Sequence, residues 1–413
     1  MNNLLSLDQA LQQMLNALPA PDAGQTEILT LMAAQNRICA EDICSPINVP
    51  SFDNSAMDGY AVRIADLADG QPLPIAGKSF AGTPFNADLP AKSAVRIMTG
   101  AMIPLGCDAV IMQEQAEIDA DGKVRFNADV KAAIKTGQNI RREGEDVKRG
   151  EVVLQQGAKL TAVSLPLLAS LGIEQLRVFK RVKVALISTG DELISVGKPL
   201  KAGQIYDTNR FAVQLMLQKW GCEILDYGIL PDDEALFEQK FNQAQQQADL
   251  VITSGGVSVG EADFTKTVLE KLGQVNFWKL AIKPGKPFAF GKLENAWFCG
   301  LPGNPVSALV TFYQLVQPVL ARLSGFSQWQ KPIQLQAISS APLKKAVGRL
   351  DFQRGFYHVN DDGQIEVRAV GFQGSHLFSA FVASNCFIVL ERERGNVAIG
   401  EHVIIEPFDT TLN

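Results

Sequence analysis

Four glycine-containing loops are the parts of this chain whose residue types and spacing point to chemistry. They adjoin apolar runs between residues 181 and 325, at 188–192, 254–260, 283–287 and 300–305. Glycine lets a backbone approach an oxyanion closely, and a helix that follows such a loop offers free N–H groups and the positive end of its dipole. The loops therefore predict a binding site for a phosphorylated ligand.

Charged side chains near these loops indicate what else such a site would hold. Lys279, Lys283 and Lys286 supply positive charge for phosphate. The nearby acids, which would repel a bare phosphate, are Glu192, Asp232, Asp233, Glu261 and Asp263. Acids beside a phosphate fit a hard divalent cation such as Mg²⁺, which prefers oxygen ligands and bridges phosphate groups.

Each of these features also has a plain structural interpretation. Gly255-Gly256 after a strand forms a tight turn in many proteins, the lysines suit a solvated rim, and Asp232 or Asp233 suits a helix cap. Known phosphate motifs do not decide the matter, because Pro72 stands where a P-loop needs its first glycine and no G-x-G-x-x-G follows an expected strand.

Two further polar clusters lie in the first half of the chain. Residues 52–61 surround Asp53 and Asp58 with small and polar side chains, which suits a contact loop or a loop of Asx turns. The other cluster combines residues 97–100 with the polar residues Arg141, Arg142, Glu145 and Asp146. A surface hinge with exposed charge would have the same composition.

Periodicity predicts the elements that position these residues. Residues 7–18 have helical spacing behind a capping box of Ser6 and Gln9, and a second amphipathic stretch spans 26–38. Residues 46–141 indicate a small β-rich domain. Between 181 and 325, expected strands at 182–188, 223–230, 249–253 and 297–300 accompany expected helices at 211–220, 234–247 and 305–323. This alternation predicts a parallel sheet covered by helices, and alternation after 332 predicts a C-terminal β domain.

Composition narrows the function classes. The 413 residues carry a net charge of −6, so no basic excess indicates nucleic acid or an anionic membrane. The longest apolar region, 160–173, is shorter than the ~20 residues that span a bilayer, and the N-terminus lacks the features of a signal peptide. Six cysteines without a C-x-x-C pair favour reduced thiols and a cytoplasmic location, and three histidines, all late in the chain, disfavour His-dependent catalysis.

Seven ordered segments resemble the molybdopterin molybdenumtransferases, the bacterial molybdenum-insertion enzymes related to the gephyrin E domain. The segments are 52–61, 188–193, 206–209, 228–233, 254–263, 283–287 and 300–305. The resemblance covers nearly the whole chain and is looser after Pro332.

The resemblance implies a multidomain α/β and β fold in an elongated homodimer. Its parts would be an N-terminal helical/β module (1–45 plus 142–180), an inserted β-rich domain (46–141), a three-layer α/β/α domain with a mostly parallel sheet (181–327), and a β-barrel-like end (328–413). In this family the active site lies between the α/β/α domain of one subunit and the inserted domain of the other.

The family reaction takes adenylated molybdopterin and molybdate, with Mg²⁺, and yields molybdenum cofactor and AMP. By resemblance, the residues that would organise Mg²⁺ or a water are Glu192, Asp232 and Asp263. Those that would hold molybdate or the terminal phosphate are Lys279, Lys283, Arg354 and Ser375. The loop residues that would bind substrate are Ser254, Gly255, Gly256, Pro302 and Pro305, and those from the partner subunit are Asp58, Thr99, Arg141 and Asp146.

The resemblance also implies partners. A separate molybdopterin adenylyltransferase would deliver the substrate, since no fused adenylyltransferase domain is present in these 413 residues, and downstream cofactor-maturation proteins would receive the product. Two other functions use the same fold without this reaction: a pterin or nucleotide carrier or scaffold, and a hydrolase of pyrophosphate-linked nucleotides.

Overall fold

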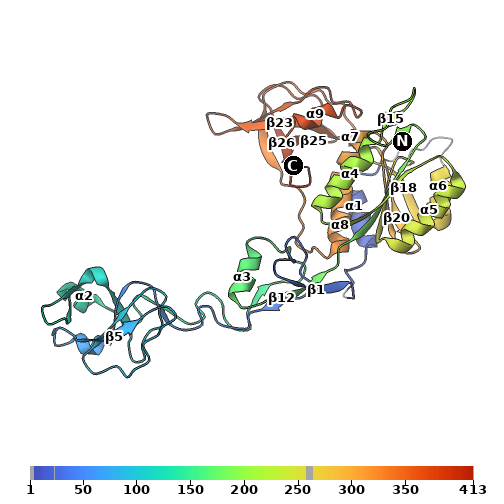
Figure 1. Ribbon diagram of the computed structural model, residues 1–413. Helices are drawn as coiled ribbons and strands as arrows, with labels where there is room; N and C mark the ends of the chain where they lie inside the picture. The colour runs from blue at the N-terminus through green and yellow to red at the C-terminus, as the bar shows by residue number, and fades with distance from the viewer. Residues whose placement is uncertain (1–3, 23, 257–263, 413) are drawn as a thin grey trace. The chain divides into compact units, whose positions relative to one another are not determined.

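A computed structural model describes residues 4–22, 24–256 and 264–412. The chain forms two compact units, whose elements are labelled in Figure 1. Unit 1 comprises Met1–Ala40, Gly157–Thr161 and Gln175–Asn413, and unit 2 comprises Glu41–Gln156 and Ala162–Glu174. The finer division into four domains stays a prediction.

A six-stranded sheet forms the centre of unit 1, in the order β16-β13-β17-β21-β20-β18. Its bounds are β13 Lys183–Thr189, β16 Glu223–Leu230, β17 Leu250–Ser254, β18 Gly273–Lys279, β20 Pro287–Leu293 and β21 Trp297–Leu301. The first four strands in the sheet order are parallel. Strand β20 runs antiparallel to both of its neighbours, β21 and β18, so β18 runs in the same direction as the first four. The predicted mostly parallel sheet is therefore confirmed.

Helices cover both faces of this sheet (Figure 1). Val184 and Leu186 of β13 belong to one apolar cluster, with helices α1 Leu7–Ala17, α4 Thr208–Lys219, α7 Pro305–Thr311 and α8 Gln317–Ser324. Ala185 and Ile187 face the opposite cluster, with α5 Glu234–Gln247 and α6 Phe264–Leu272. Alternate residues of one buried strand thus pack on two helical layers, which gives the α/β/α architecture.

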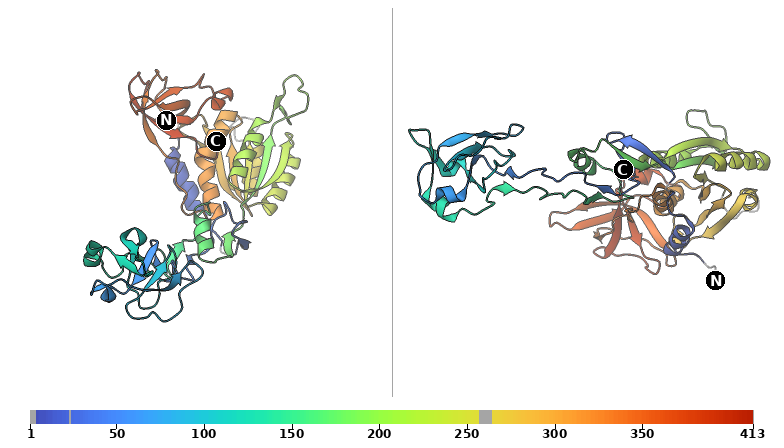
Figure 2. Two further views of the ribbon diagram at one scale, coloured as in Figure 1. Left: turned by 60° about the vertical axis from the view of Figure 1, so that its left-hand side comes forward. Right: turned by 90° about the horizontal axis from the view of Figure 1, so that it is seen from below.

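The expected helix at 305–323 is interrupted by a π-helical segment, η3 Phe312–Val316. Pro318 explains the interruption, because proline lacks an N–H and its ring clashes with the carbonyl four residues earlier in a regular α-helix. Pro305–Ser324 is long and apolar enough to cross a membrane, yet 89% of that window is buried inside the protein. It is the core helix of the unit, and α1 lies beside α8 (Figure 2).

Five strands near the C-terminus close into a barrel. They are β22 Leu335–Ser339, β23 Leu350–Val359, β24 Ile365–Ala369, β25 Cys386–Leu390 and β26 His402–Pro407, and pairing of β23 with β25 completes the ring. A short helix, α9 Ser379–Val382, precedes β25. A sixth strand, β19 Ile282–Lys283, joins β23 from the sheet domain and pairs Lys283 with Asp351. The C-terminal β-barrel expectation is confirmed.

The N-terminal segment gives one confirmed and one corrected prediction. Helix α1 begins with the predicted capping box, in which Ser6 and Gln9 bond reciprocally. The amphipathic stretch at 26–38 is not a helix. Its first part is strand β1 Thr26–Thr30, which pairs antiparallel with β12 Gln175–Phe179. After a turn, Arg37 donates to the Phe179 carbonyl and pairs with Glu27, so the apolar residues serve this strand pair. A further two-stranded pair, β14 Leu193–Ile194 and β15 Ile205–Tyr206, precedes α4.

Unit 2 is β-rich, as predicted. Its main sheet has the order β5-β6-β4-β7, formed by Ile75–Ser79, Ala94–Ile97, Gly59–Val62 and Ala109–Met112. Paired short strands are β2 Ile43–Cys44 with β11 Val152–Leu154, β3 Asn54–Ser55 with β10 Ile140–Arg141, and β8 Ala116–Ile118 with β9 Val124–Phe126. Its helical segments are η1 Ile64–Leu67, η2 Gln113–Gln115, α2 Ala128–Ala133 and α3 Ser164–Ser170.

Candidate functional site

The polar loops of unit 1 meet at one edge of the six-stranded sheet. In the strand register, Thr189 pairs with Leu230, and Ser254 pairs with both Ser188 and Leu301. The carboxyl ends of four parallel strands therefore lie side by side, and the segments beginning at Gly190, Pro231, Gly255 and Pro302 leave from the same edge. This is where open α/β sheets bind ligands, and it confirms that these loops gather.

The lysine loop also lies at this edge, as expected. Residues 283–287 follow β18, which is antiparallel to β20 and therefore runs in the same direction as β21, so the loop lies beyond the carboxyl end of a strand. Pairing of Lys279 with Pro287, and of Ala289 with Gly300, brings the end of β18 and the start of β20 to the edge where β21 ends. Lys279 and Lys286 are exposed there.

A buried amide ties two of these loops together. Asn209, in the first turn of α4, donates through Nδ2 to Ser254 Oγ at 2.9 Å and to the Gly303 carbonyl at 2.7 Å. Its other amide atom, Oδ1, is buried without a protein partner. Asp207 caps this helix through the Arg210 N–H, so the Asn209 backbone is itself fixed. The clamp sets the spacing between the ends of β17 and β21.

Three carboxylates lie at the neighbouring strand ends. The Asp232 N–H donates to Asp191 Oδ1 at 3.1 Å. Partial burial of an otherwise exposed carboxylate, followed by repulsion from Asp191 and Glu192, raises the pKa of Asp232 above its ordinary value. A divalent cation would relieve this repulsion, so the oxygen donors Glu192 and Asp232 fit the expected Mg²⁺ chemically.

The third expected metal ligand, Asp263, lies outside the described residues, together with Gly260 and Glu261. Within 4–22, 24–256 and 264–412, no three His, Cys, Asp or Glu side chains form a group that would hold a metal ion. The capping alternative holds for one of the paired acids, because Asp233 Oδ1 accepts from the Leu236 N–H at the start of α5.

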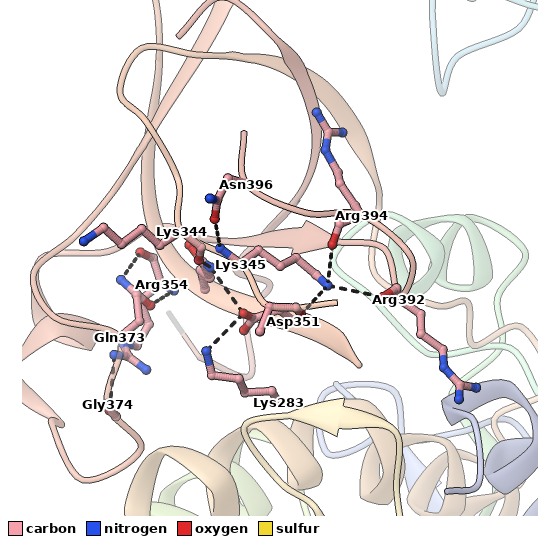
Figure 3. A network of polar contacts seen from close by, with 12 residues as sticks. Lys283, Lys344, Lys345, Asp351, Arg354, Gln373, Gly374, Arg392, Arg394 and Asn396 are labelled. Carbon is pink, nitrogen blue, oxygen red and sulfur yellow. Dashed lines mark hydrogen bonds and ion pairs between the residues drawn. The ribbon is translucent and has the colours of Figure 1, made fainter. Parts of the chain in front are cut away.

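The C-terminal barrel supplies further polar groups near the start of α7. The Val306 N–H donates to the Ser375 carbonyl at 3.2 Å, so the loop at 372–375 lies against this helix end. The Arg354 side chain, 1% exposed, holds that loop by donating through Nη2 to the carbonyls of Phe372 and Gly374, as Figure 3 shows in part. Its Nε is buried without a protein partner, and burial lowers the pKa of Arg354 from its ordinary value. Arg354 and Ser375 thus lie beside the Pro302 and Pro305 loop.

The turn that carries Lys283 packs on the same helix. Gly285 has φ +107°, and a Cβ at this position would lie 2.7 Å from Thr311 Cγ2 of α7. Lys283 Nζ contacts Asp351 Oδ2 at 3.3 Å across the β19–β23 pair (Figure 3). The close packing of the glycine and this ion pair fix the lysine loop.

The remaining predicted residues belong to unit 2, where Asp58 and Thr99 come together. The Asp58 carboxylate accepts 2.8 Å hydrogen bonds from both the N–H and the hydroxyl of Thr99. These bonds hold the pKa of Asp58 below its ordinary value. The predicted contact loop is therefore structured around an ionised carboxylate.

The two polar clusters of unit 2 are also joined. Asp53 accepts from Arg142 Nη1 at 2.6 Å and from the Glu143 N–H at 2.8 Å, so the Asx-turn interpretation is wrong for Asp53. Arg141 is exposed on β10, paired with Asn54, and the Asp146 N–H donates to the Val49 carbonyl. Residues 139–146 thus line the segment that leads to Asp58.

Three residues of this arrangement were absent from the predicted site: Asn209, Asp351 and Lys345. Asn209 and Asp351 lie in segments that had been noted, 206–209 and 351–354, but their importance arises from contacts distant in sequence. Lys345 lies in a region without a distinctive motif, and no sequence signal indicates it.

The fold and the site define a multidomain protein with a molybdopterin-binding α/β domain. Family models match residues 5–172 ("MoeA N-terminal region (domain I and II)"), 185–322 ("Probable molybdopterin binding domain") and 336–408 ("MoeA C-terminal region (domain IV)"). The chain belongs to the molybdopterin molybdenumtransferase family and is a transferase of molybdenum cofactor biosynthesis that inserts molybdenum into molybdopterin.

Similar proteins extend over the full length of the chain. A molybdopterin molybdenumtransferase of Haemophilus influenzae is 70% identical over 99% of this chain and 100% of its own. Gephyrin of Dictyostelium discoideum is 32% identical, over 97% of this chain and 62% of its own. A crystal structure of the MoeA protein of Pyrococcus horikoshii OT3 superposes with a TM-score of 0.82 at 30% identity, covering 98% of this chain and all of that chain.

Proposed function

We propose that the molybdenum-inserting reaction of this protein takes adenylated molybdopterin and molybdate, and releases AMP with the finished cofactor. The observation that carries the proposal is the convergence of glycine loops, lysines and carboxylates at one edge of the α/β sheet. Cleaving a phosphoanhydride requires a site that holds phosphate, offsets its charge and admits a second oxyanion. These residue types meet each requirement.

The two sides of the edge have different chemical roles in this proposal. Ser254, Gly255 and Gly256 and the turn at Pro302 and Pro305 present backbone groups and little side-chain bulk toward the pterin phosphates. Lys279 and Lys283, with Arg354 and Ser375 behind them, hold the molybdate. Opposite charge on the lysines offsets the charge that develops as the anhydride breaks.

Mg²⁺ would be held by Glu192 and Asp232, with Asp263 as the third predicted ligand, and would neutralise phosphate charge. The raised pKa of Asp232 supports this assignment, because its cause includes two neighbouring carboxylates that a cation would screen.

The proposal includes a cytoplasmic homodimer with a shared active site. A second subunit would supply Asp58 and Thr99, with Arg141 and Asp146. The Asp58–Thr99 pair supports this part of the proposal. Its hydrogen bonds hold an ionised carboxylate in a fixed position, and among the described residues no cation is bonded directly to that carboxylate. An adenylyltransferase would deliver the substrate, and cofactor-maturation proteins would accept the product.

Product analysis with purified adenylated molybdopterin tests the reaction. AMP release that requires both molybdate and Mg²⁺, with formation of molybdenum cofactor, is the expected result. AMP release without molybdate would instead assign a hydrolase, and stoichiometric binding without AMP would assign a carrier or scaffold. Asp232→Asn should abolish AMP release and leave the circular dichroism spectrum unchanged, because Asp232 is exposed and only its backbone N–H bonds to Asp191.

A further inference from the structure

We propose that Asp351 is a positioning residue that holds the Lys283 ammonium at the oxyanion site against the repulsion of a second, buried lysine, Lys345. The inference rests on the proposed function, in which Lys283 contacts molybdate. Figure 3 shows the three side chains and the barrel loop around them.

Asp351 is buried, and its carboxylate has few partners. The Asp351 side chain is 4% exposed and that of Lys283 is 38% exposed. Oδ2 of Asp351 accepts from Lys283 Nζ and from Gln353 Nε2, each at 3.3 Å. Gln353 is fixed in turn because its Nε2 also donates to the Lys344 carbonyl at 2.8 Å. A buried carboxylate held this rigidly determines where the lysine head group lies.

Lys345 supplies charge without being able to bind a ligand. Its side chain is buried, and Nζ donates to the carbonyls of Ala346, Arg392 and Arg394 at 3.1, 3.4 and 3.0 Å. An ammonium has three N–H groups, so these three acceptors leave no donor for a substrate. Burial lowers the pKa of Lys345, the neighbouring Asp351 opposes that effect, and Lys283 adds to it.

Lys283 is in the opposite situation. Of its three N–H groups, one is directed to Asp351, and the partly exposed head group can offer the others to an anion. Without Asp351, repulsion between two ammonium groups in a half-buried site would drive the flexible Lys283 side chain into solvent. The carboxylate therefore keeps a mobile cation in place, and Lys283, Lys345 and Asp351 together carry one net positive charge.

A double-mutant cycle on the full-length protein tests this role. Asp351→Asn, which keeps the side-chain shape, should raise the KM for molybdate about tenfold with a much smaller change in kcat. In a Lys283→Ala background the same substitution should change the KM by less than about twofold, because Asp351 acts through the missing ammonium. Glu366→Gln, on neighbouring strand β24, is the matched control and should leave both constants unchanged.

Equal rises in KM in both backgrounds would overturn the inference and assign Asp351 a general structural role. A lower KM in Asp351→Asn would also overturn it, since the carboxylate would then only repel the anion. Wild-type protein without molybdate-dependent turnover contradicts the proposed function, whereas wild-type turnover with an unchanged KM in Asp351→Asn contradicts only this inference.

A second measurement needs only wild-type protein and covers the case in which Asp351→Asn does not fold. Amine acylation followed by mass spectrometry should modify Lys283 more slowly than the exposed Lys286 and barely modify Lys345. Molybdate should slow labelling of Lys283 further. Lys283 labelling as fast as Lys286, with or without molybdate, would overturn the proposal.

Discussion

Individual polar side chains, rather than loop composition, set the geometry of this site. Asn209 shows this, because one amide group bonds both Ser254 and the Gly303 carbonyl. It is buried in the first turn of a helix, so its position depends on helix packing and on the Asp207 cap. Two glycine-containing loops thus acquire a defined separation.

Replacement of Asn209 by Ala should lower both stability and activity. Loss of one buried and one partly buried hydrogen bond, which leaves Ser254 and Gly303 without this donor, should reduce the free energy of unfolding by about 1–3 kcal/mol. Urea denaturation followed by circular dichroism measures the loss. Asn276→Ala, at an exposed position on β18, is the control, and equal stability of the two variants would contradict the clamp.

At the scale of elements, the sequence predicted most of the α/β fold and the gathering of its polar loops at one sheet edge. The bounds of α5 and β16 match the expected ranges, since strong periodicity and clear turn signals delimit them. The amphipathic stretch at 26–38 was predicted less well, because β1 pairs with β12, a strand that lies far along the chain beyond the inserted residues. Contacts such as Lys283–Asp351 depend on the same kind of distant pairing, which spacing along the chain does not encode.

Packing of the Lys283 turn against α7 predicts a sharp difference between two glycines. Gly285→Ala should destabilise the protein by about 1–3 kcal/mol, because φ +107° disfavours a side chain and the added Cβ meets Thr311. Gly303→Ala should change the melting temperature little, since nothing lies within 4 Å of a Cβ there. Differential scanning calorimetry compares them, and equal melting temperatures would show that the turn is not packed as described.

A buried carboxylate in the barrel gives unit 1 a pH-dependent stability. Burial raises the pKa of Glu406, although Gln334 and Gln314 donate to it and oppose the effect. Since the folded protein binds this proton more tightly than the unfolded chain, the contribution of Glu406 is present below its unfolded pKa. It is lost as pH rises through the folded pKa.

Glu406→Gln should therefore gain stability relative to wild type as pH rises from below about 4.5 toward neutrality. Melting temperatures measured across this range give the difference between variant and wild type at each pH. A constant difference between Glu406→Gln and wild type would show that the Glu406 carboxyl does not titrate differently on folding.

For the whole molecule, the testable question is whether two copies build each active site. Asp58→Asn and Asp232→Asn should each be inactive alone, because one changes unit 2 and the other unit 1. If the site is shared in a symmetric dimer, random pairing of the two variants should restore about a quarter of wild-type activity, since half the dimers then carry one intact site.

Co-expression with two different affinity tags, followed by purification of the mixed dimers, measures this directly, and the purified mixed dimers should show about half of wild-type activity, because each carries one intact site of two. Mixed dimers without activity, or a monomeric mass by light scattering, would contradict the shared site. Wild-type protein co-expressed under both tags is the control for the tags themselves.

The path of the chain through its two units has a consequence for biosynthesis. The backbone leaves unit 1 after Ala40 and after Thr161, and returns at Gly157 and at Gln175. On the ribosome, β1 and α1 emerge early, but β12 and α8, on which they pack, are translated only after the intervening residues. All residues of unit 2 are translated before α8, so the apolar side of α1 has no packing partner until then. We therefore expect nascent-chain folding to be nested, with the N-terminal segment unpaired until the rest of unit 1 has been translated.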